Sequence, residues 1–375
     1  MPSFVPLGIA DYSGNNERGF VQFTYQIADN NAKELTLQIR DGSSVIYEEK
    51  ITDANKLKKG EHIWKWDGFD SGGILDTAKL TQYENLNLYT IGVDSSNNYS
   101  RKKLDFSMRY DEVKWVDVKI DKNSKRIDVT LRVNLKDGGA RGIECKEVIH
   151  RDHLNPGMRT SKEVCPWDKI PETDINKYGK EPIKERAKSF EYLKQLALEG
   201  INKYWSRHNG NIGVGIKLNE ELYEVFVNAI NDKKGMVAPE LIYFTNSENT
   251  TFNRSHNWEM SRKLFYKEGY LKNKDWLYLA ASKAEKRFVE TAAHEVGHEL
   301  LAELKGEYHS YTHKGTSHWS VILQDPVSGT RYPTSGEIDL MKYADDYLPS
   351  DYYSRVILSE KDLLGLIWLS KLKNQ

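Results

Sequence analysis

One stretch decides how the second half of this chain is expected to fold: Phe288-Val-Glu-Thr-Ala-Ala-His294-Glu295-Val-Gly-His298-Glu-Leu-Leu-Ala302. Apolar residues recur in it at spacings of three and four, which predicts an α-helix with one buried face. His294 and His298 lie one turn apart on the same side of that helix, so both imidazoles can reach one metal ion. The spacing predicts a zinc site in which Glu295 stands beside the metal and accepts a proton from the attacking water.

An ordinary helix with two exposed histidines is the alternative interpretation. The Ala-Ala pair before the motif and the Leu-Leu pair after it favour a buried helix instead. The chain contains no Walker A loop, no Gly-x-Gly-x-x-Gly after a strand and no Gly-x-Ser-x-Gly elbow. The zinc motif is therefore the main chemical signal in the sequence.

Length and charge narrow the classes of function. The chain has 375 residues, enough for two or three domains that each have a core. Its 54 Lys and Arg almost balance its 55 Asp and Glu, so no net field favours nucleic acid or an anionic membrane. The longest apolar run, Leu363–Leu369, is about a third of a membrane span. We expect no nucleic-acid partner and no membrane insertion. The N-terminus lacks a Sec-type signal peptide, so export would require another apparatus.

Residues 1–110 show the alternation of apolar and polar residues that is typical of half-buried β-strands. We expect a small β-sandwich, with strands at 20–27, 35–39, 62–66, 86–93 and 104–108. The turn Trp66-Asp-Gly-Phe-Asp-Ser-Gly-Gly73 resembles a turn of immunoglobulin-like modules related to flagellar hook-cap domains. Asp67 and Asp70 raise the alternative of a calcium loop, but Ala78 stands where an EF-hand has Glu, so a plain tight turn is favoured.

Residues 111–180 are predicted to form a β-hairpin, at 115–120 and 127–133, followed from Asp137 by an irregular linking region. The two cysteines of the chain, Cys145 and Cys165, fall in that region. They are compatible with a disulfide or with two free thiols. A second metal cluster with His150 and His153 is the weaker alternative, because the spacing matches no common structural zinc pattern.

Residues 181–375 show helical and strand patterns in the order expected of a zincin-like metallopeptidase domain. A helix is predicted from about Pro182 to Asn209, then short strands at 222–227, 241–244 and 276–279, then the zinc helix with a stop at Gly306. The chain is thus predicted to be α+β, with an immunoglobulin-like β-sandwich before a zincin-like domain.

A catalytic zinc site needs a third protein ligand and an open position for water. Leu301 and Leu304 occupy the positions where a metzincin has Gly and His, which excludes that class. The candidates that remain all follow the motif: Glu303, Glu307, His309, His313, His318 and Glu337.

Four segments of the C-terminal half resemble the zinc-metallopeptidase toxin domains found at the C-termini of type VI secretion spike (VgrG) and Rhs-type proteins. They are residues 310–317, 332–343, 351–355 and 362–369, and the likeness spans about 183–372. In that family the Glu of Gly-Glu-Ile-Asp-Leu-Met completes the zinc site, which implies Glu337 as the third ligand. A solvated Glu at the start of a helix is the alternative.

The resemblance implies an antibacterial effector that hydrolyses peptide bonds with Zn²⁺ held by His294, His298 and Glu337. It implies three kinds of partner: type VI secretion spike components, a cognate immunity protein, and protein or peptide substrates in the periplasm of a target cell. That compartment would suit a disulfide. The chain is expected to be either a free cargo effector or part of a longer spike protein. Candidates for transition-state or substrate contacts are His313, Tyr352, Tyr353 and Arg355. Two alternatives are a secreted binding module with a structural zinc and a zinc amidase that acts on peptidoglycan.

Overall fold

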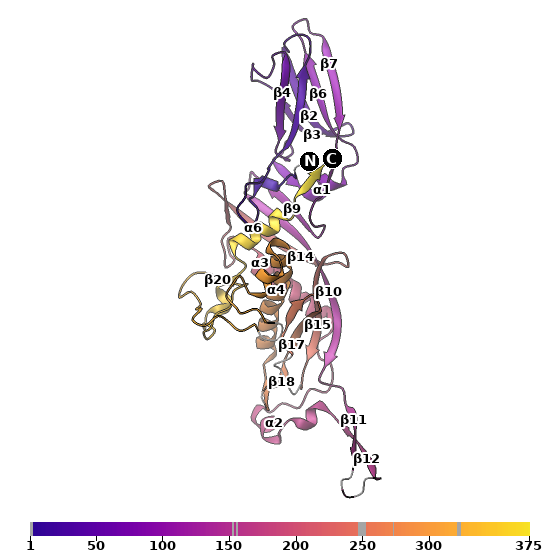
Figure 1. The fold of residues 1–375 in the computed structure, drawn as a ribbon, viewed down its shortest axis with the longest axis vertical. Helices are drawn as coiled ribbons and strands as arrows, with labels where there is room; N and C mark the ends of the chain where they lie inside the picture. Colours follow the sequence, from indigo (N-terminus) through magenta and orange to yellow (C-terminus); the bar gives the residue numbers. More distant parts are fainter. Residues whose placement is uncertain (1–2, 152–153, 155–156, 247–252, 273, 321–323) are drawn as a thin grey trace. The chain divides into compact units, whose positions relative to one another are not determined.

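The computed structural model describes residues 3–151, 154, 157–246, 253–272, 274–320 and 324–375 (Figure 1). The chain is mixed, with 22% helix and 38% strand, which confirms the predicted α+β class. It divides into two compact units, and the first contains Met1–Leu131, Ser206–Asn228 and Ser359–Gln375. The second contains Arg132–Trp205 and Ala229–Leu358. These boundaries differ from the predicted ones near residues 110 and 180, because the chain passes between the units several times.

Two β-sheets make up the N-terminal part of the first unit. One pairs β1 (Val21–Ile27) with β4 (Gly60–Trp66), and the other has the order β3 (Ser44–Lys50), β2 (Glu34–Asp41), β6 (Leu86–Val93), β7 (Tyr99–Asp105). Trp64 of β4 stacks on Tyr47 of β3, with ring centroids 6.2 Å apart, and its indole N–H donates a 2.8 Å bond to Glu49. Side chains from both sheets therefore meet, as the period-two pattern predicts. The pattern did not indicate β3, whose residues are mostly exposed.

The predicted tight turn joins β4 to β5 (Ile74–Asp76). Asp70 Oδ1 accepts backbone N–H bonds of 2.9 Å from Gly72 and from Ile74, and Asp67 Oδ1 accepts one of 3.2 Å from Phe69. Carboxylates that bind the backbone of their own turn need no metal ion to explain them.

The other elements of the first unit come from distant parts of the sequence. β22 (Leu372–Asn374) pairs with β8 (Met108–Tyr110), and Leu372 also bridges to Phe4. In α6 (Glu360–Trp368), Asp362 accepts a 2.8 Å bond from the Tyr12 hydroxyl. The last seventeen residues, 359–375, thus belong to the first unit and not to the predicted metallopeptidase domain. The unit also contains η1 (Pro6–Gly8), α1 (Thr77–Gln82), β9 (Val116–Asp121), β13 (Ile216–Leu218) and most of β14 (Glu221–Asn231).

A mixed sheet forms the centre of the second unit. The later part of β10 (Arg126–Arg141) is parallel to β15 (Met236–Phe244), β15 is parallel to β17 (Ser261–Lys267), and β16 (His256–Trp258) runs antiparallel to β17 at the edge. β9 and the first part of β10 form the predicted hairpin.

Two helices, α3 (Phe190–Trp205) and α4 (Ala281–Lys305), lie side by side against this sheet (Figure 1). Gly200 of α3 permits the close approach, because a Cβ at that position would lie 2.0 Å from the Val289 carbonyl oxygen of α4. α3 is shorter than predicted. It begins after Ser189, whose hydroxyl accepts a 3.2 Å bond from the Tyr192 N–H, as at a helix N-cap.

The region predicted to be irregular, from Asp137 to residue 180, contains regular secondary structure. It holds the end of β10, a hairpin of β11 (Lys146–Arg151) and β12 (Arg159–Val164), η2 (Pro166–Lys169) and α2 (Glu172–Tyr178). Cys145 and Cys165 flank the hairpin and form a disulfide, so the structure adopts the first of the predicted alternatives. His153, of the weaker metal-cluster alternative, lies outside the described residues. Both hairpin strands are almost wholly exposed, and for this reason they lack the apolar alternation that identifies a strand.

The second unit also contains β18 (Gly269–Lys272), β19 (Asp275–Tyr278), α5 (Glu307–Tyr311), β20 (Ile338–Asp339), η3 (Tyr352–Ser354) and β21 (Val356–Ile357). In the part of the chain that the structure describes, no helix is both long and apolar enough to cross a bilayer.

Candidate metal centre

The helix α4 carries His294, Glu295 and His298, and all three side chains are buried. The helix ends at Gly306, as predicted. Two hydrogen bonds from neighbouring elements fix its middle turns. The Trp205 indole N–H of α3 donates to the Ala293 carbonyl at 3.2 Å, and the Asn257 amide of β16 donates to the Glu295 carbonyl at 2.8 Å. The motif is therefore held both by α3 and by the edge strand of the sheet.

His313 supplies a third imidazole beside the two histidines of α4. The ligand atoms of His294, His298 and His313 all lie within 4.8 Å of one another. His313 is completely buried and has a φ of +48°, in the left-handed region that a residue with a side chain rarely adopts. The Thr316 hydroxyl holds this conformation, since it donates 2.7 Å to the His313 carbonyl and accepts 2.8 Å from the Tyr343 N–H. A strained backbone that its surroundings hold in place is common at functional sites.

The two histidines of α4 have their Nδ1 atoms occupied by hydrogen bonds. His294 Nδ1 donates to the Leu340 carbonyl at 2.7 Å. His298 Nδ1 donates to the Ser310 hydroxyl at 3.0 Å, and that hydroxyl in turn donates to the His298 carbonyl at 2.7 Å. A proton on Nδ1 leaves the Nε2 of each neutral ring with a lone pair.

His313 follows the same pattern. Its Nδ1 donates to the Ser317 hydroxyl at 2.7 Å, and Ser317 Oγ donates at 3.4 Å to the Tyr311 carbonyl. All three rings are thus in the tautomer that presents Nε2 as the ligand atom. Metal-binding histidines are typically oriented by such bonds from the nitrogen that does not face the metal.

Buried polar atoms without a hydrogen-bond partner lie together at the three histidines. Nε2 of His294, Nε2 of His313 and Oε2 of Glu295 are buried and have no hydrogen-bond partner. Most buried polar atoms do have one. Burial lowers the pKa of His294 to about 4 and also lowers the pKa values of His298 and His313, so the rings are neutral at pH 7. These features fit a divalent cation among the three Nε2 atoms, and imidazole donors suit zinc, copper, iron and nickel.

Glu295 lies beside the three rings and not among the ligands. Burial raises the pKa of its carboxyl to about 8, although the positive charge of Arg254 opposes the rise. A carboxyl with a pKa near neutrality can exchange a proton at physiological pH, which suits a general base.

The structure does not bring Glu337, the third ligand implied by the family resemblance, to this cluster. Glu337 is exposed, and its neighbour Ile338 in β20 is buried. Adjacent side chains of an extended segment point in opposite directions, so burial of Ile338 turns Glu337 outward. The segment does reach the site, but through the Leu340 carbonyl and through Tyr343, whose ring stacks on His313 with centroids 3.6 Å apart.

The other predicted contact residues have different positions. Tyr352 and Tyr353 line a cavity of about 440 Å³ that adjoins His294 and Glu295. The Tyr352 hydroxyl donates a 3.0 Å bond to Glu290. Arg355 does not line this cavity. Its guanidinium donates 2.7 Å to the Gly336 carbonyl and pairs with Asp351, so it holds the loop that precedes β20.

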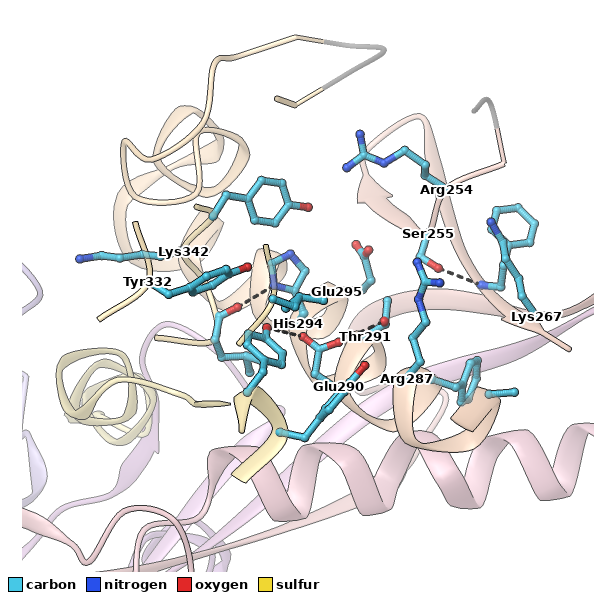
Figure 2. Close-up of a pocket in the computed structure, with 18 residues that line it drawn as sticks. Arg254, Ser255, Lys267, Arg287, Glu290, Thr291, His294, Glu295, Tyr332 and Lys342 are labelled. Atoms are coloured by element: carbon cyan, nitrogen blue, oxygen red, sulfur yellow. Dashed lines mark hydrogen bonds between the residues drawn. The ribbon is translucent and has the colours of Figure 1, made fainter. Parts of the chain in front are cut away.

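Figure 2 shows His294, Glu295 and Glu290 in this cavity, with Tyr332 on one side and Arg254 and Arg287 on another. Arg254, Tyr343 and the two serines that orient the histidines, Ser310 and Ser317, are not predicted as site residues from the sequence. The only sequence signal for them is weak: Ser317 lies four residues after His313 in a loop rich in Gly, Ser and Thr.

Comparison of the chain with protein-family models, with curated proteins and with solved structures finds no significant match. The resemblance to secreted toxin domains therefore stays a prediction from the sequence.

Proposed function

We propose that this protein is a zinc-dependent hydrolase, specifically a metallopeptidase, whose metal is held by His294, His298 and His313. The observation that carries the proposal is the convergence of three imidazoles, each with its Nδ1 bonded and its Nε2 directed to a common point. A zinc ion bound there would lower the pKa of a water molecule and polarise a substrate carbonyl. Among the described residues the group contains three protein ligands, as in catalytic zinc sites, whereas structural sites have four.

Glu295 is the general base in this proposal. The pKa of this carboxyl would fall from its raised value if the three histidines held a cation, because opposite charge favours the carboxylate. The carboxylate then accepts a proton from the attacking water and donates it to the leaving amine. Tyr343 and Arg254 lie against Glu295 and His294 and are the candidates to donate a hydrogen bond to the developing oxyanion.

The arrangement of the second unit supports a zincin-like domain. Its motif helix lies against a mixed sheet, and the antiparallel edge strand β16 is bonded to the motif through Asn257. An edge strand next to the site can bind an extended peptide by adding it to the sheet. This would bring a backbone carbonyl next to the three histidines, where a metal would polarise it and Glu295 would activate the water, and it suits a peptide substrate better than a small amide.

The biological role that we propose is that of an antibacterial effector delivered by type VI secretion and neutralised in the producer by an immunity protein. The sequence resemblance is the basis for this role. The Cys145–Cys165 disulfide supports it, because disulfides persist in oxidising compartments such as the bacterial periplasm.

The test is hydrolysis of unfolded casein by zinc-loaded wild-type protein beside Glu295→Gln. We expect the variant to keep its zinc and its melting temperature and to lose about 10²- to 10⁴-fold in rate. Equal rates would exclude Glu295 as the base. Cleavage of purified peptidoglycan without cleavage of casein would instead support the amidase, and no Glu295-dependent reaction on either substrate would support a binding module with a structural zinc.

A further inference from the structure

The cavity beside His294 and Glu295 is unusually rich in cationic side chains. Its volume of about 440 Å³ is in the range of small-ligand pockets, which is roughly 300–1,000 Å³. Arg254, Lys267, Arg287 and Lys342 all line it. Figure 2 shows Arg254, Arg287 and Lys267 on the same side of Glu295, and Lys342 on the opposite side of His294. The first three form one group, which we call the basic wall.

The charges of Arg254 and Arg287 affect the pKa of Lys267 within the basic wall. Lys267 packs under the rings of Phe244 and Phe265, and its ammonium donates a 2.5 Å bond to the Asn253 carbonyl. Burial, together with the charges of Arg287 and Arg254, lowers the pKa of Lys267 to about 7. No carboxylate contributes to that shift. Near pH 7 the wall therefore holds two guanidinium charges beside a lysine that is only partly protonated, and their mutual repulsion costs stability. Such clusters of like charge are common at functional sites.

Two carboxylates in the cavity, Glu290 and Glu295, lie within the influence of Arg287 and Arg254, but burial outweighs these charges and leaves the pKa of each carboxyl raised. The neighbouring carboxylates on α4 have other partners: Glu285 pairs with Lys188 at 3.1 Å and Glu299 with Arg262 at 3.5 Å. Within the cavity, Glu290 accepts bonds from two hydroxyl groups, and burial raises its pKa, so it tends toward the neutral acid. The wall therefore retains positive charge next to the proposed reaction centre.

We propose that the basic wall binds a carboxylate group of the substrate close to the bond that is cleaved. This inference rests on the proposed peptidase function and names its specificity. Two guanidinium groups suit a carboxylate, because each offers a planar fork of donors. The carboxylate can come from an Asp or Glu side chain or from the free C-terminus of a peptide, and the experiment separates these sources.

The first arm of the test measures cleavage. Zinc-loaded wild-type protein, Arg287→Glu and Lys283→Glu digest a denatured proteome, and mass spectrometry identifies the cleaved bonds. Arg287 and Lys283 are both exposed on α4, so the two variants change charge equally, but only Arg287 lines the cavity. We expect about tenfold enrichment of Asp and Glu, or of free C-termini, at one position near the cleaved bond. Arg287→Glu should lose this preference, and Lys283→Glu should keep it.

The second arm measures binding without catalysis. Zinc-loaded Glu295→Gln is titrated with three labelled hexapeptides: Ala-Ala-Ala-Glu-Ala-Ala amide, its Gln counterpart, and the Gln peptide with a free C-terminal carboxylate. We expect the Glu peptide, the free-acid peptide or both to bind about tenfold more tightly than the Gln amide. Adding Arg287→Glu should remove the difference.

The two measurements together distinguish failure of the carboxylate site from failure of the peptidase proposal. Cleavage with no preference for acidic groups, together with equal binding of all three peptides, would overturn the carboxylate site and leave the peptidase proposal intact. Preferential binding of a carboxylate peptide without any cleavage would support the site and overturn the peptidase proposal. A preference that survives Arg287→Glu would also overturn the assignment.

Discussion

Replacement of Ser317 by alanine tests whether His313 is a metal ligand, because the Ser317 hydroxyl contacts the imidazole only at Nδ1. The 2.7 Å bond from Nδ1 selects the tautomer and the ring orientation. Loss of such an orienting bond typically reduces metal affinity by about 10- to 100-fold, which corresponds to about 1.4–2.7 kcal/mol. His313 also has a strained, left-handed backbone. Without the bond to Ser317, the residue can relieve that strain by moving its ring out of the cluster. We expect a decrease in zinc affinity of that size.

The affinity is measured by competition with a chromogenic chelator, and unfolding in denaturant is followed in parallel. The free energy of unfolding of the metal-free variant should fall by only about 1 kcal/mol, the usual contribution of one hydrogen bond. Ser328→Ala is the matched control, since Ser328 is exposed and follows in the same part of the chain. If Ser317→Ala and Ser328→Ala bind zinc with the same affinity, the reasoning that the Ser317 bond orients His313 as a ligand is refuted.

Two further predictions concern packing and pH. Gly200→Ala places a methyl group 2.0 Å from a carbonyl oxygen of α4, so the free energy of unfolding in denaturant should fall by about 1–3 kcal/mol. The control Gly92→Ala, whose added methyl group has no atom within 4 Å, should leave that free energy nearly unchanged. In protein treated with a chelator, the pKa of His294 is about 4 when folded and near 6.5 when unfolded, so its contribution to stability is lost as the pH falls from about 6.5 towards 4. The pKa of Glu295 is about 8 when folded and near 4.5 when unfolded, so its contribution is lost as the pH rises towards about 8. Burial also lowers the pKa values of His298 and His313, so below pH 6.5 the three histidines together outweigh Glu295. We therefore expect the melting temperature of this form to be highest near pH 6.5, and Glu295→Gln to reduce the decline above it; a melting temperature that is independent of pH between 5 and 8 would contradict the burial of these groups.

The sequence predicts those parts of the site that depend on local periodicity. The spacing of His294 and His298 and the stop at Gly306 define α4, because helical geometry alone places residues four apart on one side. The alternating strands of the first unit are predicted for the same reason, except β3 and β7, which bury too little of their surface to show the pattern. The strand predicted at 104–108 covers only the end of β7 and the start of β8.

The third imidazole depends on contacts that no local pattern encodes. His313 reaches the cluster through a left-handed backbone and through Thr316, which bonds to Tyr343 at a distance of 27 residues in sequence. The segment that contains Glu337 does approach α4, but a backbone carbonyl, that of Leu340, makes the contact with His294. Any residue type has that carbonyl, so the sequence carries no signal for it.

The unit boundaries are also set by long-range pairing. β22 returns to pair with β8 across more than two hundred residues, and the end of the chain thereby joins the first unit. Strand pairing of this kind depends on register and geometry between distant segments, which composition and periodicity do not specify.

Metal content tests the central claim most directly. Mass spectrometry on purified wild-type protein, His313→Ala, Glu337→Ala and Glu295→Gln gives the number of zinc ions per chain. We predict about one zinc for the wild type, for Glu337→Ala and for Glu295→Gln, and loss of zinc from His313→Ala. Retention of zinc by His313→Ala together with its loss from Glu337→Ala would contradict the three-histidine site.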